Sequence, residues 1–155
     1  LDAEMHVAST SGTRRISAED FFKGELETAL MPNEFLEAVA FKRQSAAERS
    51  IFLELGNRRH GFAVVGLALR LLIEDDRCTM ARIATLGGAS VAQRNLPAET
   101  VLEGRKIDEN VTVAAVEALR GGLNPPEDVH ADADYRRHAL GIMLDRALRS
   151  ELNLW

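Results

Sequence analysis

The feature that most limits the fold is a period of two in the apolar residues between Val65 and Ile73. Large side chains occupy every second position of this segment, namely Val65, Leu67, Leu69, Leu71 and Ile73. The positions between them carry smaller or polar residues, with one exception at Leu72. This spacing predicts a β-strand with one fully buried face. A helix through Phe62–Leu72 is the alternative, because Ala and Leu are good helix formers.

The residues on either side of this segment predict two further strands. Glu74–Arg77 interrupts the apolar run with charged residues, and Cys78–Leu86 reads as a strand that returns beside the first. Together the two strands predict a β-hairpin. Ile51–Leu55 precedes the hairpin and reads as another strand. We therefore expect a three-stranded antiparallel sheet.

After this sheet the apolar spacing changes to three and four, which is typical of helices. Three helix starts are expected, at Pro97, at Asp108 or Asn110, and at Asp132 or Asp134. The last helix carries an apolar stripe made of Leu140, Met143, Leu144, Ala147, Leu148 and Leu152. Strands followed by helices predict an α+β fold in which the helices pack on one face of the sheet.

The first part of the chain predicts a smaller subdomain. Its expected strands are Met5–Ser9, Thr13–Ile16 and Phe35–Phe41. Ser17 is placed to cap a short helix over Ala18–Phe22. Phe21 and Phe22 are expected in the core, because two phenyl rings bury a large apolar area. The polar stretch from Arg43 to Arg49 suggests a boundary near residue 46, which divides the chain into 1–46 and 47–155.

Composition and charge exclude several functional classes. The net charge of −5, with both signs mixed, argues against nonspecific nucleic-acid binding. No stretch approaches the roughly 20 apolar residues of a membrane-spanning helix. The single cysteine, Cys78, excludes an internal disulfide and a thiolate-rich or iron–sulfur site within the chain. A cytoplasmic location is expected, and the start at Leu1 without a methionine reads like the interior of a longer protein.

The polar residues offer little catalytic chemistry. The four histidines have no ligand spacing, so no metal site is expected. His138, beside Arg136 and Arg137, is expected to be solvated or packed, and no catalytic residue is expected. Cys78, inside a strand, is expected to be a small buried hydrophobe. Arg58-Arg59-His60 joins two strands; it either holds an anion or is a solvated loop, and the residues alone leave both readings open. Gly87-Gly88 is interpreted as a turn at the end of a strand.

Three short motifs, in order along the chain, resemble one protein family. Asp20-Phe21-Phe22-Lys23-Gly24 leads on to Thr28, Leu30, Pro32 and Glu34; Arg58-Arg59-His60-Gly61 precedes a strand pair that ends in Leu86-Gly87-Gly88; and Ala133-Asp134-Tyr135-Arg136-Arg137-His138 opens the last helix. Together they are similar to the flavoprotein (medium) subunit of molybdenum hydroxylases. That family includes the carbon monoxide dehydrogenase medium chain and the flavin domain of xanthine dehydrogenase.

The resemblance implies an electron-transfer role. In this family FAD takes electrons that come from a molybdenum cofactor in a large subunit, through 2Fe-2S clusters of a small subunit, and passes them to an acceptor. The chain matches only the later part of such a subunit. Residues 1–46 would be the end of the FAD-binding domain and residues 47–155 the C-terminal domain. The glycine-rich FAD loops of the family's N-terminal part have no counterpart here, so that part would be a missing partner.

The resemblance also implies which residues contact the cofactor. Thr28 and Leu36 fall in the family's T-L-P-E-x-L motif beside the flavin, Arg58 in its A-R-R-x-G-D segment, and Gly87 and Gly88 in its L-G-G motif. Phe62 follows Gly61 where the family has an aspartate, which weakens the expectation of NAD as acceptor. The flavin does the redox chemistry, and the protein positions it.

A non-catalytic role is the alternative. The chain would then be a module that docks partner subunits and does not itself bind flavin. The face of the last helix that carries Arg136, Arg137, Arg146 and Arg149 is expected to be exposed and compatible with such docking.

Overall fold

The computed structural model describes residues 1–58 and 61–152, with side chains described up to Ser150. The chain divides into two compact units, Leu1–Gln44 and Ser45–Trp155. Each unit is described by itself.

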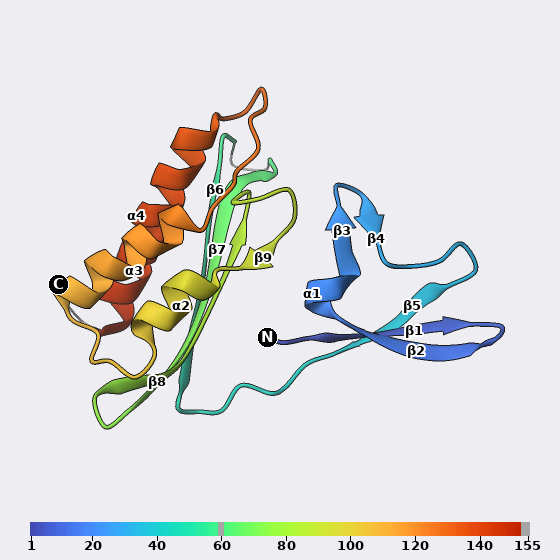
Figure 1. The fold of residues 1–155 in the computed structure, drawn as a ribbon, viewed down its shortest axis with the longest axis horizontal. Helices are drawn as coiled ribbons and strands as arrows, with labels where there is room; N and C mark the ends of the chain where they lie inside the picture. The colour runs from blue at the N-terminus through green and yellow to red at the C-terminus, as the bar shows by residue number, and fades with distance from the viewer. Residues whose placement is uncertain (59–60, 153–155) are drawn as a thin grey trace. The chain divides into compact units, whose positions relative to one another are not determined.

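The second unit is built on a four-stranded antiparallel sheet (Figure 1). Its strands are β6 (Glu48–Gly56), β7 (Ala63–Glu74), β8 (Arg77–Leu86) and β9 (Gln93–Arg94), hydrogen-bonded in that order. Asp75 and Asp76 form the two-residue turn between β7 and β8, both with positive φ, as the tight turns that suit twisted strands require. The strand at 63–74 confirms the period-two prediction and excludes the alternative helix.

The sheet has one strand more than expected. β9 pairs only with Ala84 and Thr85 of β8. Two residues are too few to show a period of two, so the sequence pattern could not reveal this strand.

Three helices cover one face of this sheet (Figure 1): α2 (Leu96–Leu102), α3 (Glu109–Gly121) and α4 (Ala133–Leu152). Asn95 caps α2 by accepting the Ala98 N–H (3.1 Å), and Asp108 caps α3 by accepting the Val111 N–H (2.9 Å). Asp132 accepts the Tyr135 N–H (2.7 Å) at the start of α4. The structure therefore selects Asp108 and Asp132 from the expected caps, and it confirms the α+β arrangement.

The core lies between these helices and the sheet. The expected face of β7 is buried, with Leu67 fully buried and Leu69 at 2% exposure. Its fully buried helical partners include Leu102, Leu119, Leu140, Leu144 and Leu148. Burial of each such leucine stabilises the fold by about 1.5–3 kcal/mol. The stripe predicted for the last helix is thus confirmed up to Leu148, and the side chain of Leu152 lies outside the described residues.

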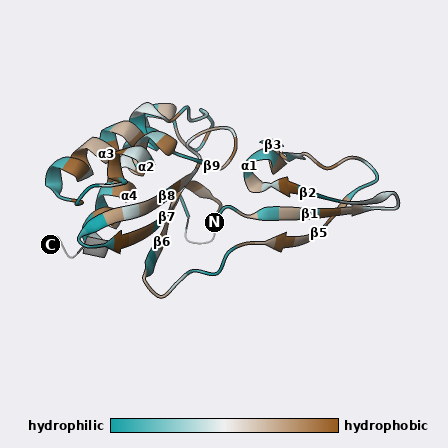
Figure 2. Cartoon of the chain, turned by 60° about the horizontal axis from the view of Figure 1, so that its bottom comes forward, coloured by the Kyte–Doolittle hydropathy of each residue, from teal (hydrophilic) through white to brown (hydrophobic). Residues whose placement is uncertain are grey.

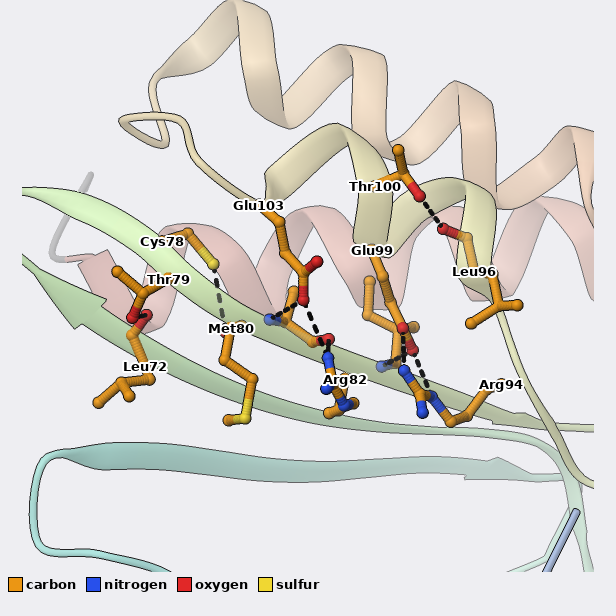
Figure 3. Close-up of polar contacts among 12 residues, drawn as sticks. Leu72, Cys78, Thr79, Met80, Arg82, Arg94, Leu96, Glu99, Thr100 and Glu103 are labelled. Atoms are coloured by element: carbon orange, nitrogen blue, oxygen red, sulfur yellow. Dashed lines mark hydrogen bonds and ion pairs between the residues drawn. The ribbon is translucent and has the colours of Figure 1, made fainter. Parts of the chain in front are cut away.

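The outer edge of β8 is covered by groups from α2 and its flanks (Figure 3). The Glu99 carboxylate accepts the Ile83 N–H (2.9 Å), and the Glu103 carboxylate accepts the Ala81 N–H (3.1 Å). Arg94 and Arg82 donate to these two carboxylates. The buried carboxylate of Glu99 is thus both charge-paired and hydrogen-bonded, as burial of a charge requires.

The first unit is smaller. A three-stranded antiparallel sheet has the order β2-β1-β5, and a short pair, β3 and β4, lies beside α1 in the sequence. The bounds are β1 Glu4–Ser9, β2 Gly12–Ser17, α1 Ala18–Phe21, β3 Phe22–Gly24, β4 Glu27–Thr28 and β5 Phe35–Ala40. Ser17 accepts the Asp20 N–H (3.1 Å), which confirms the predicted cap, although the helix is one residue shorter than expected.

The core of the first unit consists of Met5, Val7, Ile16 and Phe21. Phe22 was predicted to join it, and that prediction is wrong: 45% of Phe22 is exposed. The helix ends at Phe21, and because successive side chains of the strand that follows alternate, Phe22 points away from the core. β5 is hydrophobic along much of its length (Figure 2), and every one of its residues is exposed.

Candidate functional site

One end of the sheet in the second unit brings together three of the predicted site residues. Gly56, at the end of β6, pairs with Ala63, at the start of β7. Gly66 of β7 pairs with Leu86, the last residue of β8. The loop that contains Arg58 and the turn that contains Gly87 and Gly88 therefore lie at the same end of the sheet. We call them the basic loop (Asn57, Arg58 and Gly61 among the described residues) and the glycine turn (Gly87-Gly88).

The glycine turn is tightly packed against the protein. Gly87 has a φ of +72°, and a Cβ atom there would lie 2.4 Å from the Val64 carbonyl oxygen. A Cβ on Gly88 would lie 2.7 Å from Thr85 Oγ1. The Asn124 N–H also donates to the Gly88 carbonyl (2.9 Å). Gly87 is thus required by its backbone conformation and close packing, and Gly88 by close packing alone, which accounts for the turn that the sequence predicted.

The basic loop borders a shallow cavity of about 340 Å³. Its lining comes from the end of β6, the loop and the start of β7: Glu54, Leu55, Gly56, Asn57, Arg58, Gly61 and Ala63. Arg58 is exposed. Arg59 and His60, which belong to the same predicted cluster, lie outside the described residues. A guanidinium at the rim of a polar hollow suits an anionic group, such as a phosphate or a carboxylate.

Arg136 is the residue at this end of the sheet that sequence reasoning misplaced. It was expected on the exposed face of the last helix, and it is only 4% exposed. Its Nη1 donates to the Val64 carbonyl, and its Nη2 donates to Asp128 Oδ2 (2.7 Å). The signal was present in the sequence, because Arg136 lies four residues before Leu140 and so shares the buried face of the helix.

Asp128 connects Arg136 to the basic loop. Its carboxylate also accepts the N–H groups of His130 (2.8 Å) and Ala131 (3.1 Å). These bonds, chiefly the one from His130, with that from Arg136, hold the pKa of Asp128 below its ordinary value. The His130 carbonyl in turn accepts a hydrogen bond from Asn57 Nδ2 (3.3 Å). A continuous set of hydrogen bonds therefore runs from β7 through Arg136 to the basic loop.

The other two predicted site residues belong to the first unit. Thr28 ends β4, and its Oγ1 accepts the Leu30 N–H (3.4 Å). Leu36 lies in β5, opposite Val7 of β1, and is 40% exposed. The structure thus does not gather the five predicted residues within one unit.

An ion pair between Arg14 and Glu34, which we call the polar clamp, holds the segment between Thr28 and Leu36. Arg14 donates from Nε and Nη2 to the Glu34 carboxylate (2.7 and 2.8 Å) and also to the Ala29 carbonyl (2.8 Å). Glu34 accepts the Met31 N–H as well (2.8 Å). The bond from Arg14, followed by that from Met31, lowers the pKa of Glu34 to about 2. Sequence reasoning did not identify Arg14, because twenty residues separate it from Glu34.

A second hollow, of about 530 Å³, lies between β6 and α4. Ile51, Leu53 and Ile142 contribute apolar side chains to it, and His138 and Arg146 contribute polar ones. His138 is exposed.

Cys78 is fully buried, as predicted, and burial raises the pKa of its thiol to about 11. The thiol is therefore uncharged near neutral pH and is not an activated nucleophile. Within residues 1–58 and 61–152 no group of His, Cys, Asp and Glu side chains is arranged to hold a metal ion. None of the described helices is long and apolar enough to cross a membrane.

Comparison with known proteins gives a family match over most of the second unit. Residues 50–150 match the model described as CO dehydrogenase flavoprotein C-terminal domain. The chain is 30% identical over 155 residues to the 6-hydroxypseudooxynicotine dehydrogenase complex subunit alpha of Paenarthrobacter nicotinovorans, covering 99% of this chain and 52% of that protein. It is 27% identical to the carbon monoxide dehydrogenase medium chain of Afipia carboxidovorans, over 96% of this chain and 51% of the relative.

Solved structures agree with these relatives. A carbon monoxide dehydrogenase from Hydrogenophaga pseudoflava matches with a TM-score of 0.90 and 27% identity, covering 94% of this chain and 51% of that one. Quinoline 2-oxidoreductase from Pseudomonas putida 86 matches with a TM-score of 0.87 and 33% identity, covering 97% and 52%. The chain thus spans about half the length of the curated relatives that it matches.

Proposed function

The chain belongs to the CO dehydrogenase flavoprotein C-terminal domain family, and we propose that it is part of the FAD-containing electron-transfer subunit of a molybdenum-hydroxylase-type oxidoreductase. In that role it helps to pass electrons from iron–sulfur clusters through FAD to an acceptor. The family membership confirms the resemblance found in the three motifs. The observation that carries the proposal is the match of both units, at 99% coverage of the chain, to a subunit of a dehydrogenase complex.

The two units have different roles in this proposal. Residues 1–46 are the end of an FAD-binding domain, and residues 47–155 are the C-terminal domain that closes over the cofactor. Thr28 and Leu36 of the first unit, and Arg58, Gly87 and Gly88 of the second, contact the flavin in the assembled subunit.

The described residues fit part of an FAD site. FAD supplies the electron transfer when it is bound. The exposed guanidinium of Arg58, beside a polar hollow, suits the charged or polar edge of a cofactor. The glycine turn, by contrast, is explained by its packing against Val64 and Thr85 and needs no ligand. What this chain offers is therefore one side of the flavin site, while the pyrophosphate needs a cradle of backbone N–H groups from elsewhere.

The partners follow from the same proposal. A large subunit holds the molybdenum cofactor, a small subunit holds 2Fe-2S clusters, and the glycine-rich FAD loops come from an N-terminal part. We propose a cytoplasmic location for the complex. The single cysteine of this chain, Cys78, is free and buried, so the chain needs no oxidising compartment to form a disulfide.

The non-catalytic docking alternative loses the feature that suggested it. The arginine face of α4 is not a free basic surface. Arg136 is buried, Arg137 pairs with Asp134 (3.0 Å), and Arg149 pairs with Glu109 (2.7 Å) and Asp145. Of the four arginines only Arg146 is exposed, as expected. We therefore retain only the flavoprotein proposal.

Isolation of the native complex tests this proposal. The protein, carrying a C-terminal affinity tag, is purified from its own cells and examined by visible absorption and by metal analysis. We expect a yellow preparation that contains flavin, molybdenum and iron together with two further subunits. A colourless preparation without molybdenum would overturn the proposal, whereas one with molybdenum and iron but without flavin would restore the docking role.

A further inference from the structure

The guanidinium of Arg136 makes a bridge between parts of the chain that are distant in sequence. Nη1 donates to the carbonyl of Val64, the same oxygen that approaches the Cβ position of Gly87. Nη2 donates to the Asp128 carboxylate, which also accepts the N–H of His130. The His130 carbonyl in turn accepts a hydrogen bond from Asn57 of the basic loop. One side chain on α4 therefore touches the start of β7, lies beside the glycine turn and is connected to the basic loop.

Stability alone is a poor explanation for this arrangement. Arg136 is 4% exposed, and its Nε has no hydrogen-bond partner among the described residues. Thr85 Oγ1, beside Gly88, also lacks one. Burial of polar groups without partners costs free energy, and a buried ion pair is often less stabilising than apolar residues of similar volume.

We propose that Arg136 is a positioning residue that fixes the glycine turn and the basic loop in a single arrangement. Its planar fork determines the distance between Val64 and Asp128, and through them the positions of Gly87 and Arg58. The inference rests on the proposed function only in naming flavin as the group that the two segments face. The fixing of the two segments by Arg136 is a property of this chain's own residues.

The fork geometry separates this role from simple charge compensation. A lysine keeps the positive charge, but its ammonium group cannot reproduce the paired donors of the guanidinium plane. If Arg136 served only to neutralise Asp128, Arg136→Lys would leave the two segments unchanged. If it fixes their positions, the lysine variant fails in the same way as Arg136→Gln.

Hydrogen exchange followed by mass spectrometry tests the inference on the purified full-length protein, with or without flavin. The variants are Arg136→Lys, Arg136→Gln and Asp128→Asn. Arg137→Gln is the matched control, because Arg137 is the next residue on α4 and pairs with Asp134 at the surface. Asp128→Asn can keep an oxygen for the N–H groups of His130 and Ala131, but its NH2 group then faces Arg136 and cannot accept the hydrogen bond from Nη2. Since 43% of its side chain is exposed, this variant is expected to fold.

We expect peptides that contain Arg58 and peptides that contain Gly87 to exchange about tenfold faster or more in the three test variants, as expected for loss of a charge-assisted hydrogen bond. Peptides from α3 and from the middle of α4 should exchange as in the unaltered protein, and Arg137→Gln should change neither segment. Rescue by lysine, an unchanged rate in both segments, or a uniform increase across the core would each overturn the inference.

The visible circular dichroism of bound flavin then separates this inference from the proposed function. We expect the flavin spectrum of the native complex to change in Arg136→Lys and to stay unchanged in Arg137→Gln. A complex without flavin, in which the exchange rates still change as expected, would contradict the proposed function and leave the positioning role of Arg136 supported. A complex that contains flavin, but in which Arg136→Lys changes neither the exchange rates nor the flavin spectrum, would support the proposed function and contradict the positioning role of Arg136.

Discussion

The two units differ in how their sheets are covered. In the second unit three helices pack on one face of the sheet, and strands and helices contribute to a continuous core. In the first unit the core is the small cluster of Met5, Val7, Ile16 and Phe21, and β5 exposes its side chains. A sheet gains most of its stability by burying one face against a second layer. The first unit, taken by itself, depends more on turns, caps and ion pairs.

This contrast concerns which residues stabilise each unit. The core of the second unit contains many buried leucines, so we expect single surface substitutions to change its stability little. The first unit places its polar clamp, Arg14 and Glu34, across the segment that carries Thr28 and Leu36. The following predictions test this difference, from the largest expected effect to the smallest.

Truncation of a core leucine should have the largest effect. Leu69 and Leu144 were predicted to share one core, and they are 2% and 0% exposed in the same cluster. Leu144→Ala should lower the free energy of unfolding of the second unit by about 2–5 kcal/mol, through lost burial and the cavity left behind. Denaturant unfolding followed by helical circular dichroism measures this, since α2–α4 lie in the second unit. Ile142→Ala, at a 37% exposed position of the same helix, is the control; a similar loss there would contradict the assigned stripe.

An added methyl group in the glycine turn should have an intermediate effect. Gly87→Ala combines a positive φ with a Cβ only 2.4 Å from a backbone oxygen. We expect a loss of about 1–3 kcal/mol in thermal or denaturant unfolding. Gly121→Ala is the matched control, because no atom outside its chain neighbours and its own helix backbone lies within 4 Å of the added carbon. Equal stability of the two variants would show that the turn is not tightly packed.

Acid should weaken the first unit through Glu34. Its pKa is lowered from the ordinary 4.5 to about 2, chiefly by the hydrogen bond from Arg14. A carboxylate with a lowered pKa stabilises the folded state above its ordinary pKa, and that contribution disappears as the pH falls from 4.5 toward 2. Nuclear magnetic resonance of the Met31 amide should follow this titration, and Glu34→Gln should abolish it. A midpoint near the ordinary value would show that the clamp does not form.

The smallest expected effect is that of added FAD. Among the described residues, neither unit presents the glycine-rich cradle from which a dinucleotide gains most of its affinity. We therefore expect weak or no binding when the isolated 155-residue chain is titrated with FAD and followed by flavin fluorescence. Stoichiometric binding at low micromolar FAD would reveal a phosphate site in one of the two units and would break the proposed division of labour.

Local patterns were sufficient to predict much of the fold. The period of two identified β7, and the cap residues Ser17 and Asp108 were found because a helix start needs only a few neighbouring residues. β9 escaped because its two residues carry no period. Phe22 was misplaced because the helix ended one residue early and the side-chain direction reversed.

The candidate site was harder to predict, because the arrangement of its residues depends on contacts between distant positions in the sequence. Arg58, Gly87 and Gly88 were identified by resemblance, and the structure brings these three to one end of a sheet. The contact between Arg136 and Val64 joins residues that are 72 positions apart. Charge and spacing on a single helix cannot specify such a contact, although the phase with Leu140 did indicate burial.

The carboxylates that cover β8 also determine how this molecule can associate with others. A bare strand edge is a template on which another chain can add a strand, and proteins protect such edges from aggregation. Here Glu99 and Glu103 occupy the Ile83 and Ala81 N–H groups, and β9, only two residues long, follows on the same side (Figure 3). A further strand would therefore add more readily at β6, the longer strand at the opposite end of the sheet, than beside β8.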